Sequence, residues 1–247
     1  ASKEAHSSIA SAARVMDVDI VKVPVDDTGA LHGEQVRLAL AEHGDAVVAV
    51  VATGGSTNFG IVDDIASIAA LKDEFDVWLH VDGAYGLAAA LAPSARHRFA
   101  GIERADSLIV DPHKWLFTPF DACVLLYRDP AVARAAHTQH AEYLDTLTDR
   151  DEWSPSDYSI QLTRRPRGLP LWFSLATFGA QAYRVDGCLR SVTYVCHNGA
   201  CVTDRDSAPS RRAPPAPRDG NPGSTHGPAL DTGRIRVERG SMGGSPA

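Results

Sequence analysis

One seven-residue run constrains the fold of this 247-residue chain more than any other stretch: Ala46-Val-Val-Ala-Val-Val-Ala52. All of its residues are apolar and most are β-branched, which is typical of a strand that helices cover on both faces. Helical patterns flank it, because residues 31–43 and 63–73 carry apolar side chains at helical spacing, and the first of these ends at Gly44. We therefore expect an α/β architecture built on a largely parallel sheet flanked by helices.

Further strands are predicted on both sides of this run. The candidates are short and rich in β-branched or apolar residues: Ile20–Val25, Val77–Val81, Ser107–Val110 and Cys123–Tyr127. Alternation with helices predicts right-handed crossovers and parallel pairing. The last strand follows its predecessor too closely for a crossover helix, so we expect it to lie antiparallel.

Two more helices are predicted outside this alternation. Residues 5–14 contain small residues and Ile9, with Ser7 or Ser8 as the N-cap, and residues 168–179 form an amphipathic pattern. After the strand at Ser107–Val110, Asp111 and Pro112 offer an N-cap and a first helical residue, so a turn or a helix is expected there.

Composition argues against several kinds of partner. A net charge of -7 and a pI near 5.8 give no reason to expect nucleic acid. No apolar run approaches the length of a membrane span, no polybasic patch is present, and the first residues do not form a signal peptide. We therefore expect a cytoplasmic protein without a membrane partner. Cys196 and Cys201 lack a second ligand pair, so no metal site is expected.

Polar residues follow three predicted strands at their carboxyl ends, where open α/β sheets bind ligands. They are Ser56 and Thr57, then Asp82, and then His113 and Lys114. A lysine at such an edge can form a Schiff base with a carbonyl, and a carboxylate at the end of an apolar strand needs a cationic partner. This pair is what pyridoxal phosphate (PLP) chemistry requires. Each residue alone also fits a structural role, such as a turn former or a surface lysine.

Two spaced motifs carry a specific resemblance: His80-Val-Asp-Gly-Ala-Tyr-Gly86 and Asp111-Pro-His-Lys-Trp115. They resemble the PLP-dependent group II decarboxylases, which include aromatic-amino-acid and glutamate decarboxylases, and the similarity runs from about His6 to about Tyr183. The resemblance implies a fold-type-I PLP-dependent transferase-like large domain, a PLP cofactor, an amino-acid substrate, and a homodimeric full-length parent.

The resemblance also implies the role of each matching residue. Lys114 matches the lysine that bonds the cofactor, and His113 matches its neighbour near the phosphate. Asp82 matches the partner of the pyridine nitrogen, and Ala84 the small residue against the ring. Gly83 stands where the family frequently has alanine.

Four further positions of the site follow from the same resemblance. His6 matches a histidine that stacks on the ring and contacts the region of the substrate carboxylate. Ser56 and Thr57 occupy a loop beside the cofactor, and Asp111 stands where some members have asparagine. Tyr158, in the segment that resembles the family's mobile loop, matches the acid that protonates the decarboxylated carbon.

The composition changes after about residue 184. Residues 185–247 contain nine glycines, seven prolines and eight arginines but no lysine, and they lack apolar periodicity. We predict a partial PLP-binding large domain over 1–184 and a disordered C-terminal tail over 185–247. A frame-shifted or truncated gene model and a Pro/Gly-rich interaction tail are alternative interpretations of that tail.

The favoured function is PLP-dependent decarboxylation of an L-amino acid to the amine and CO2. Because family members carry a phosphate-gripping loop that does not precede position 1 here, we expect impaired activity in this chain. One alternative is an inactive remnant that serves as a binding or structural module. Another is a different fold-type-I enzyme, an aminotransferase or a desulfurase, which would share Asp82 and Lys114 but not Tyr158.

Overall fold

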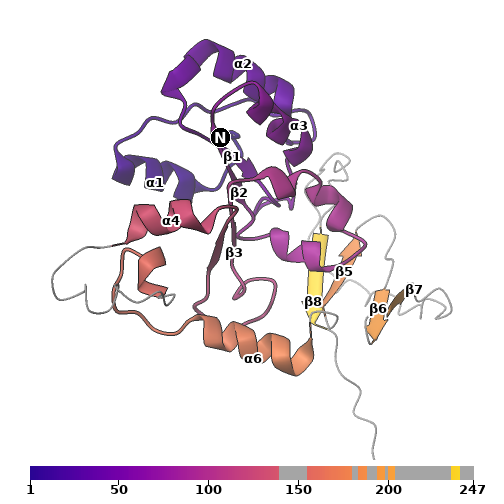
Figure 1. Cartoon of the computed structure of the whole chain (residues 1–247). Coiled ribbons are helices and arrows are strands. Elements are labelled where there is room, and N and C mark those ends of the chain that lie inside the picture. The colour runs from indigo at the N-terminus through magenta and orange to yellow at the C-terminus, as the bar shows by residue number, and fades with distance from the viewer. Residues whose placement is uncertain (139–154, 180–182, 188–193, 198–199, 204–234, 240–247) are drawn as a thin grey trace, which may run out of the picture.

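The computed structural model describes residues 1–138, 155–179, 183–187, 194–197, 200–203 and 235–239 (Figure 1). A four-stranded sheet with the strand order β1-β2-β3-β4 lies at its centre. Its strands are β1 (Ala49–Thr53), β2 (Trp78–Asp82), β3 (Ser107–Val110) and β4 (Val124–Tyr127). The first three are parallel and β4 is antiparallel to β3. The predicted α/β class and the antiparallel last strand are confirmed.

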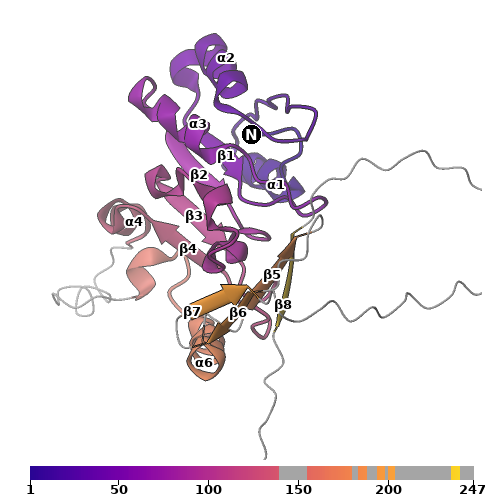
Figure 2. The same ribbon diagram turned by 90° about the vertical axis from the view of Figure 1, so that its right-hand side faces the viewer.

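Helices and short 3-10 segments connect these strands (Figures 1 and 2). The α-helices are α1 (Ser7–Met16), α2 (Gly33–His43), α3 (Ile65–Ala70), α4 (Pro130–His137) and α6 (Gly168–Phe178). The 3-10 segments are η1 (Gly44–Ala46), η2 (Leu71–Asp73), η3 (Leu87–Leu91), η4 (Arg96–Phe99), η5 (Ile102–Arg104) and η6 (Pro155–Tyr158). The predicted spans 31–43 and 63–73 therefore both contain helices.

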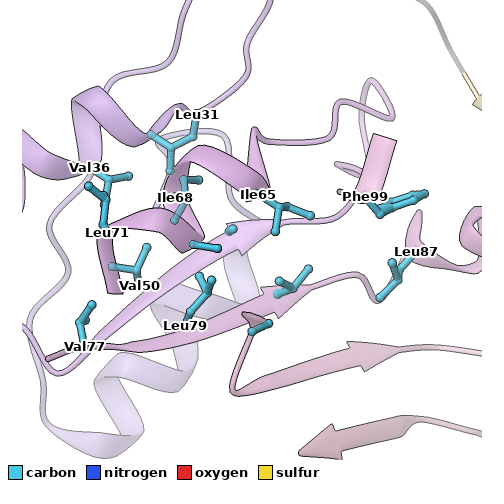
Figure 3. Close-up of a cluster of buried hydrophobic side chains, with 14 of the residues drawn as sticks. Leu31, Val36, Val50, Ile65, Ile68, Leu71, Val77, Leu79, Leu87 and Phe99 are labelled. Atoms are coloured by element: carbon cyan, nitrogen blue, oxygen red, sulfur yellow. The ribbon is translucent and has the colours of Figure 1, made fainter. Parts of the chain in front are cut away.

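The hydrophobic core lies between one face of the sheet and the pair α2 and α3. Figure 3 shows the side chains of the strands and of these helices pointing toward one another, and all of them are buried. The labelled core residues are Leu31, Val36, Val50, Ile65, Ile68, Leu71, Val77, Leu79, Leu87 and Phe99. Burying such apolar surface is the main force that holds these layers together.

The other face of the sheet is less covered than the run of valines predicted. Side chains alternate between buried and half-buried along β2, so Leu79 and Val81 face the core while His80 and Asp82 face the opposite side. On β1, Ala49 is exposed and Val51 is half-buried on that side. This second face carries the polar residues of the site described below.

Two local predictions are wrong. Ile20–Val25 forms only an isolated bridge between Val23 and Ser2, because Pro24 has no N–H to continue a ladder. The N-cap of α1 is His6, rather than Ser7 or Ser8. The turn or helix expected after Ser107–Val110 is a turn, and Phe117 behind it has a positive φ of 52°, which no regular helix can contain.

The described residues beyond 184 pair as strands, which the sequence analysis did not predict. β5 (Tyr183–Gly187) pairs antiparallel with β8 (Ile235–Arg239), and β6 (Tyr194–His197) pairs antiparallel with β7 (Ala200–Thr203). Most of the predicted tail lies outside the described residues, so its disorder and the boundary at 184 stay predictions. Within the described part of the chain, no helix has the length and apolar character needed to cross a membrane.

Candidate active site

A pocket of about 630 Å³ lies at the carboxyl edge of the parallel strands. Its walls come from the start of α1, the loop after β1, the end of β2 and the turn after β3. This volume is typical of sites for small molecules and cofactors. Seven residues proposed from sequence line it: His6, Ser56, Thr57, Asp82, Ala84, Asp111 and Lys114.

Asp82 closes β2 and is held by the backbone around it. The Ala84 N–H donates to Oδ1 of Asp82 at 3.2 Å, and the Asp111 N–H donates to the carbonyl of Ala84 at 3.1 Å. The ends of β2 and β3 are thereby joined at the pocket wall. Among the described residues no cation forms an ion pair with the half-buried Asp82 carboxylate.

The structure explains why glycine follows Asp82. A Cβ atom at Gly83 would lie 2.2 Å from Cβ of Leu87 and 2.9 Å from the carbonyl oxygen of Ile109. Both distances are shorter than a carbon atom tolerates, so an alanine side chain has no room at this position. Gly83 lets the chain turn closely over the end of β3.

Lys114 reaches the pocket from the turn after β3. Its Nζ lies 2.8 Å from Oδ2 of Asp111, and the Lys114 side chain is 35% exposed against 15% for that of Asp111. Trp115 packs against Tyr85 with ring centroids 4.8 Å apart, which ties the turn to the segment after β2. The lysine amine is therefore held at the wall of the pocket beside a carboxylate.

Two side chains fix the loop after β1, the carboxylate of Asp63 and the hydroxyl of Ser56. Asp63 is 3% exposed; its Oδ1 accepts from the Leu31 N–H at 2.9 Å and its Oδ2 from the Thr53 N–H at 2.7 Å. Burial raises the pKa of Asp63 to about 6, although these hydrogen bonds oppose the shift. The Ser56 hydroxyl accepts from the Ile61 N–H at 3.2 Å, so Ser56 also closes this loop.

His6 is placed by the helix that it begins. Its Nδ1 accepts from the Ser8 N–H at 3.2 Å, which satisfies one of the free donors at the start of α1. The imidazole is exposed and lines the pocket. A capping role and a ligand-facing position are thus combined in one residue.

Among the described residues, the pocket wall does not include His113 or Tyr158. Nδ1 of His113 lies 2.5 Å from the carbonyl oxygen and 3.1 Å from the amide nitrogen of Ala122, and the His113 ring packs edge-on against Phe120. Tyr158 lies on η6, which packs against α4. The structure therefore separates these two residues from the other seven.

Sequence reasoning missed His80, which lines the pocket and gains no role from the motif in which it stands. The signal was available, because residues two apart on a strand face the same side and His80 precedes Asp82 by two positions. Burial lowers the pKa of His80, while the nearby Asp82 carboxylate opposes the shift. The imidazole is therefore favoured in its neutral form.

Known proteins match this chain over the part that contains the pocket. The family model described as the pyridoxal-dependent decarboxylase conserved domain matches residues 1–197. The chain belongs to this family. An aromatic-L-amino-acid decarboxylase of Bacillus atrophaeus is 34% identical over 191 residues, which are 74% of this chain and 40% of that protein. A phenylacetaldehyde synthase of a Rosa hybrid cultivar is 31% identical over 74% of this chain and 38% of its own length.

Solved structures agree with this assignment. The crystal structure of Oryza sativa TDC with PLP and tryptamine superposes with a TM-score of 0.67 at 32% identity, over 72% of this chain and 38% of that one. Mouse CSAD superposes with a TM-score of 0.64 at 29% identity, over 73% of this chain and 39% of that one. The chain spans about 40% of the length of the curated relatives it matches.

The pocket fits the cofactor of a pyridoxal-dependent family by its donor set. It offers a lysine amine for an aldehyde, a carboxylate without an ion-pair partner among the described residues, and the small side chain of Ala84 in the same wall. Asp82 is the decisive member, because a half-buried carboxylate without a cation partner is poorly placed unless a ligand supplies one. A protonated pyridine nitrogen is such a partner.

Proposed function

We propose that this chain is the cofactor-binding part of a PLP-dependent decarboxylase that converts an L-amino acid to its amine and CO2. The observation that carries the proposal is the presence of Lys114 and Asp82 on the wall of one pocket, reached from successive parallel strands. The family membership of the chain supports the same reaction class.

When bound, PLP supplies a conjugated ring that accepts the electron pair released when the carboxylate bond of the substrate breaks. Lys114 provides the amine that bonds the cofactor, and that amine must first lose a proton from Nζ. Asp111 would orient this amine at the pocket wall, because its Oδ2 lies 2.8 Å from Nζ. Asp82 holds a proton at the pyridine nitrogen, where its negative charge favours the protonated ring.

The remaining assignments are parts of the same proposal. His6 presents its imidazole at the pocket and would stack on the cofactor ring. Ser56 and Thr57 would lie beside the cofactor on the side of β1. His113 is proposed near the phosphate, and Tyr158 as the acid that returns a proton to the substrate carbon. The motif match alone supports these last two roles. The described pocket wall includes neither His113 nor Tyr158.

We propose an aromatic L-amino acid as the substrate. Phe59 and Tyr85 line the pocket together with Ile9, so aromatic and aliphatic surface is available for a large apolar side chain. Among the relatives, the tyrosine/DOPA decarboxylase of Papaver somniferum and the tryptophan decarboxylase of Oryza sativa are named for aromatic substrates. A homodimeric, cytoplasmic full-length protein remains part of the proposal through the resemblance.

The test is release of CO2 from carboxyl-labelled amino acids by the full chain with added PLP. We expect release from tryptophan, tyrosine or phenylalanine and little from glutamate, and loss of release in Lys114→Arg. Lys72→Arg is the matched control, because Lys72 also pairs with a carboxylate, that of Asp106, but lies outside the pocket. Formation of a keto acid without CO2 would favour an aminotransferase, and failure of the chain to bind PLP would favour the inactive remnant.

A further inference from the structure

A line of hydrogen-bonded side chains crosses the pocket side of the sheet. The Trp78 indole N–H donates to Oγ of Ser107 at 2.9 Å, and Nδ1 of His80 lies 2.8 Å from the same oxygen. The register explains the meeting, because His80 of β2 is directly paired with Ser107 of β3, which is paired with Tyr127 of β4. The rings of Trp78 and Tyr127 pack edge-on with centroids 6.5 Å apart.

Counting hydrogens in this line determines which nitrogen of His80 carries the proton. An indole N–H can only donate, so it occupies one lone pair of the Ser107 oxygen. Nδ1 of His80 is the acceptor that the described residues offer to the single hydroxyl hydrogen of Ser107. Ser107 is only 5% exposed, so water offers little alternative. In the opposite tautomer, the Trp78 N–H and the Nδ1–H of His80 would both donate to Oγ of Ser107. The hydroxyl hydrogen of Ser107 would then lose Nδ1 as its acceptor.

The remaining ring nitrogen, Nε2, then carries the hydrogen. His80 and Asp82 line the same pocket and face the same side of β2. The two residues stand two positions apart on this face of β2, so the imidazole and the carboxylate are neighbouring side chains. A ring N–H donor is thus placed in the neighbourhood of the carboxylate on which cofactor binding depends.

We propose that Trp78 and Ser107 fix His80 as its Nε2–H tautomer, and that His80 thereby acts as a positioning residue that presents an N–H donor beside Asp82. In the described part of the chain no hydrogen bond joins His80 to Asp82, so this donor would orient the carboxylate when a ligand with a ring nitrogen fills the pocket. The second half of this inference rests on the proposed function, because it names PLP as the ligand.

The tautomer can be measured on the full chain without cofactor, by NMR of the ring nitrogens after ¹⁵N-histidine labelling. The signals of His80 are assigned as those missing in His80→Gln. We expect one nitrogen with a directly bonded hydrogen and one strongly deshielded acceptor nitrogen, with Nδ1 as the acceptor. Ser107→Ala should move the two signals toward each other, and Trp78→Phe should move them less, because the hydroxyl can still donate. Averaged nitrogens in the wild type, or no change in Ser107→Ala, would overturn the assignment.

The positioning role is tested by PLP affinity in two matched variants. The amide nitrogen of glutamine reaches the place of Nε2, whereas that of asparagine reaches only the place of Nδ1. We expect His80→Asn to weaken PLP binding by about 10-fold, the value of one hydrogen bond, and His80→Gln to retain most of the affinity. Near-UV circular dichroism confirms that both variants are folded.

The possible outcomes separate the two proposals. Equal PLP affinities in His80→Asn and His80→Gln would overturn the positioning role while leaving the proposed function in place. A wild type that does not bind PLP would overturn the proposed function, and the NMR measurement would still decide the tautomer.

Discussion

Asp63→Asn tests how the loop beside the pocket is held. Asp63 is buried and accepts hydrogen bonds from the backbone of Leu31 and Thr53, so it joins two segments that lie 32 and 10 positions away from it. Asparagine has nearly the same shape but only one acceptor oxygen. Its amide group would face one backbone N–H and leave it unpaired, which costs about 1–3 kcal/mol of the free energy of unfolding.

The pH dependence gives this prediction its sign. Burial raises the pKa of Asp63 from 3.8 to about 6 in the folded protein, a difference worth roughly 3 kcal/mol. A carboxyl group with a raised folded pKa contributes its full stability below the unfolded value of 3.8, and this contribution is lost as the pH rises through about 6. Asparagine does not titrate. The wild type should therefore be more stable than Asp63→Asn near pH 4, and the difference should shrink or reverse by pH 7.

Urea unfolding followed by tryptophan fluorescence at several values of pH between these limits measures the difference directly. Asp27→Asn serves as the control, because Asp27 is exposed, and its difference from wild type should change little with pH. A stability deficit of Asp63→Asn that stays constant, or that grows as the pH rises, would refute the reasoning. It would mean that the two backbone donors favour the ionised carboxylate more strongly than burial opposes it.

Two further predictions concern residues next to the pocket: Gly83 beside Asp82, and Cys123 near Asp111. Gly83→Ala should lower the free energy of unfolding by about 1–3 kcal/mol, because the new methyl group would overlap Leu87. Gly168→Ala is the control and should be tolerated, because its methyl group meets nothing within 4 Å. The urea midpoints of the two variants measure the difference. Burial, with the nearby Asp111 carboxylate, raises the pKa of Cys123 from 9.0 to about 11, so alkylation near pH 8, followed by peptide mass spectrometry, should be about 100-fold slower than for a thiol at the ordinary pKa. Asp111→Asn should accelerate it, and an unchanged rate would show that the carboxylate has no influence there.

Much of the site could be predicted from the sequence, because ligand sites in open α/β sheets lie at the carboxyl ends of the parallel strands. Ser107–Val110 is the observed strand β3, and the polar residues after successive parallel strands do meet at one pocket. The rule depends only on apolar runs and on the order of elements, which the sequence displays. Asp82 and Lys114 are separated by about thirty positions in the chain and still line the same cavity.

The parts that could not be predicted depend on contacts between distant segments. His113 and Lys114 are neighbours, but only the lysine lines the pocket, because the histidine bonds to the backbone of Ala122. Nothing in the local sequence indicates which of two adjacent turn residues faces the ligand. Asp63 is similar, since its role depends on backbone N–H groups at Leu31 and Thr53 that local sequence does not bring together.

The most direct test of the account is where PLP bonds to the chain. The full chain is incubated with PLP, reduced with borohydride to fix the bond, and digested for mass spectrometry. We expect the reduced adduct at Lys114, with the other three lysines, Lys3, Lys22 and Lys72, largely unmodified. It also predicts a much lower yield at Lys114 in Asp82→Asn. An adduct spread evenly over the four lysines, or one at Lys114 that is indifferent to Asp82→Asn, would contradict the claim that these two residues hold one cofactor between them.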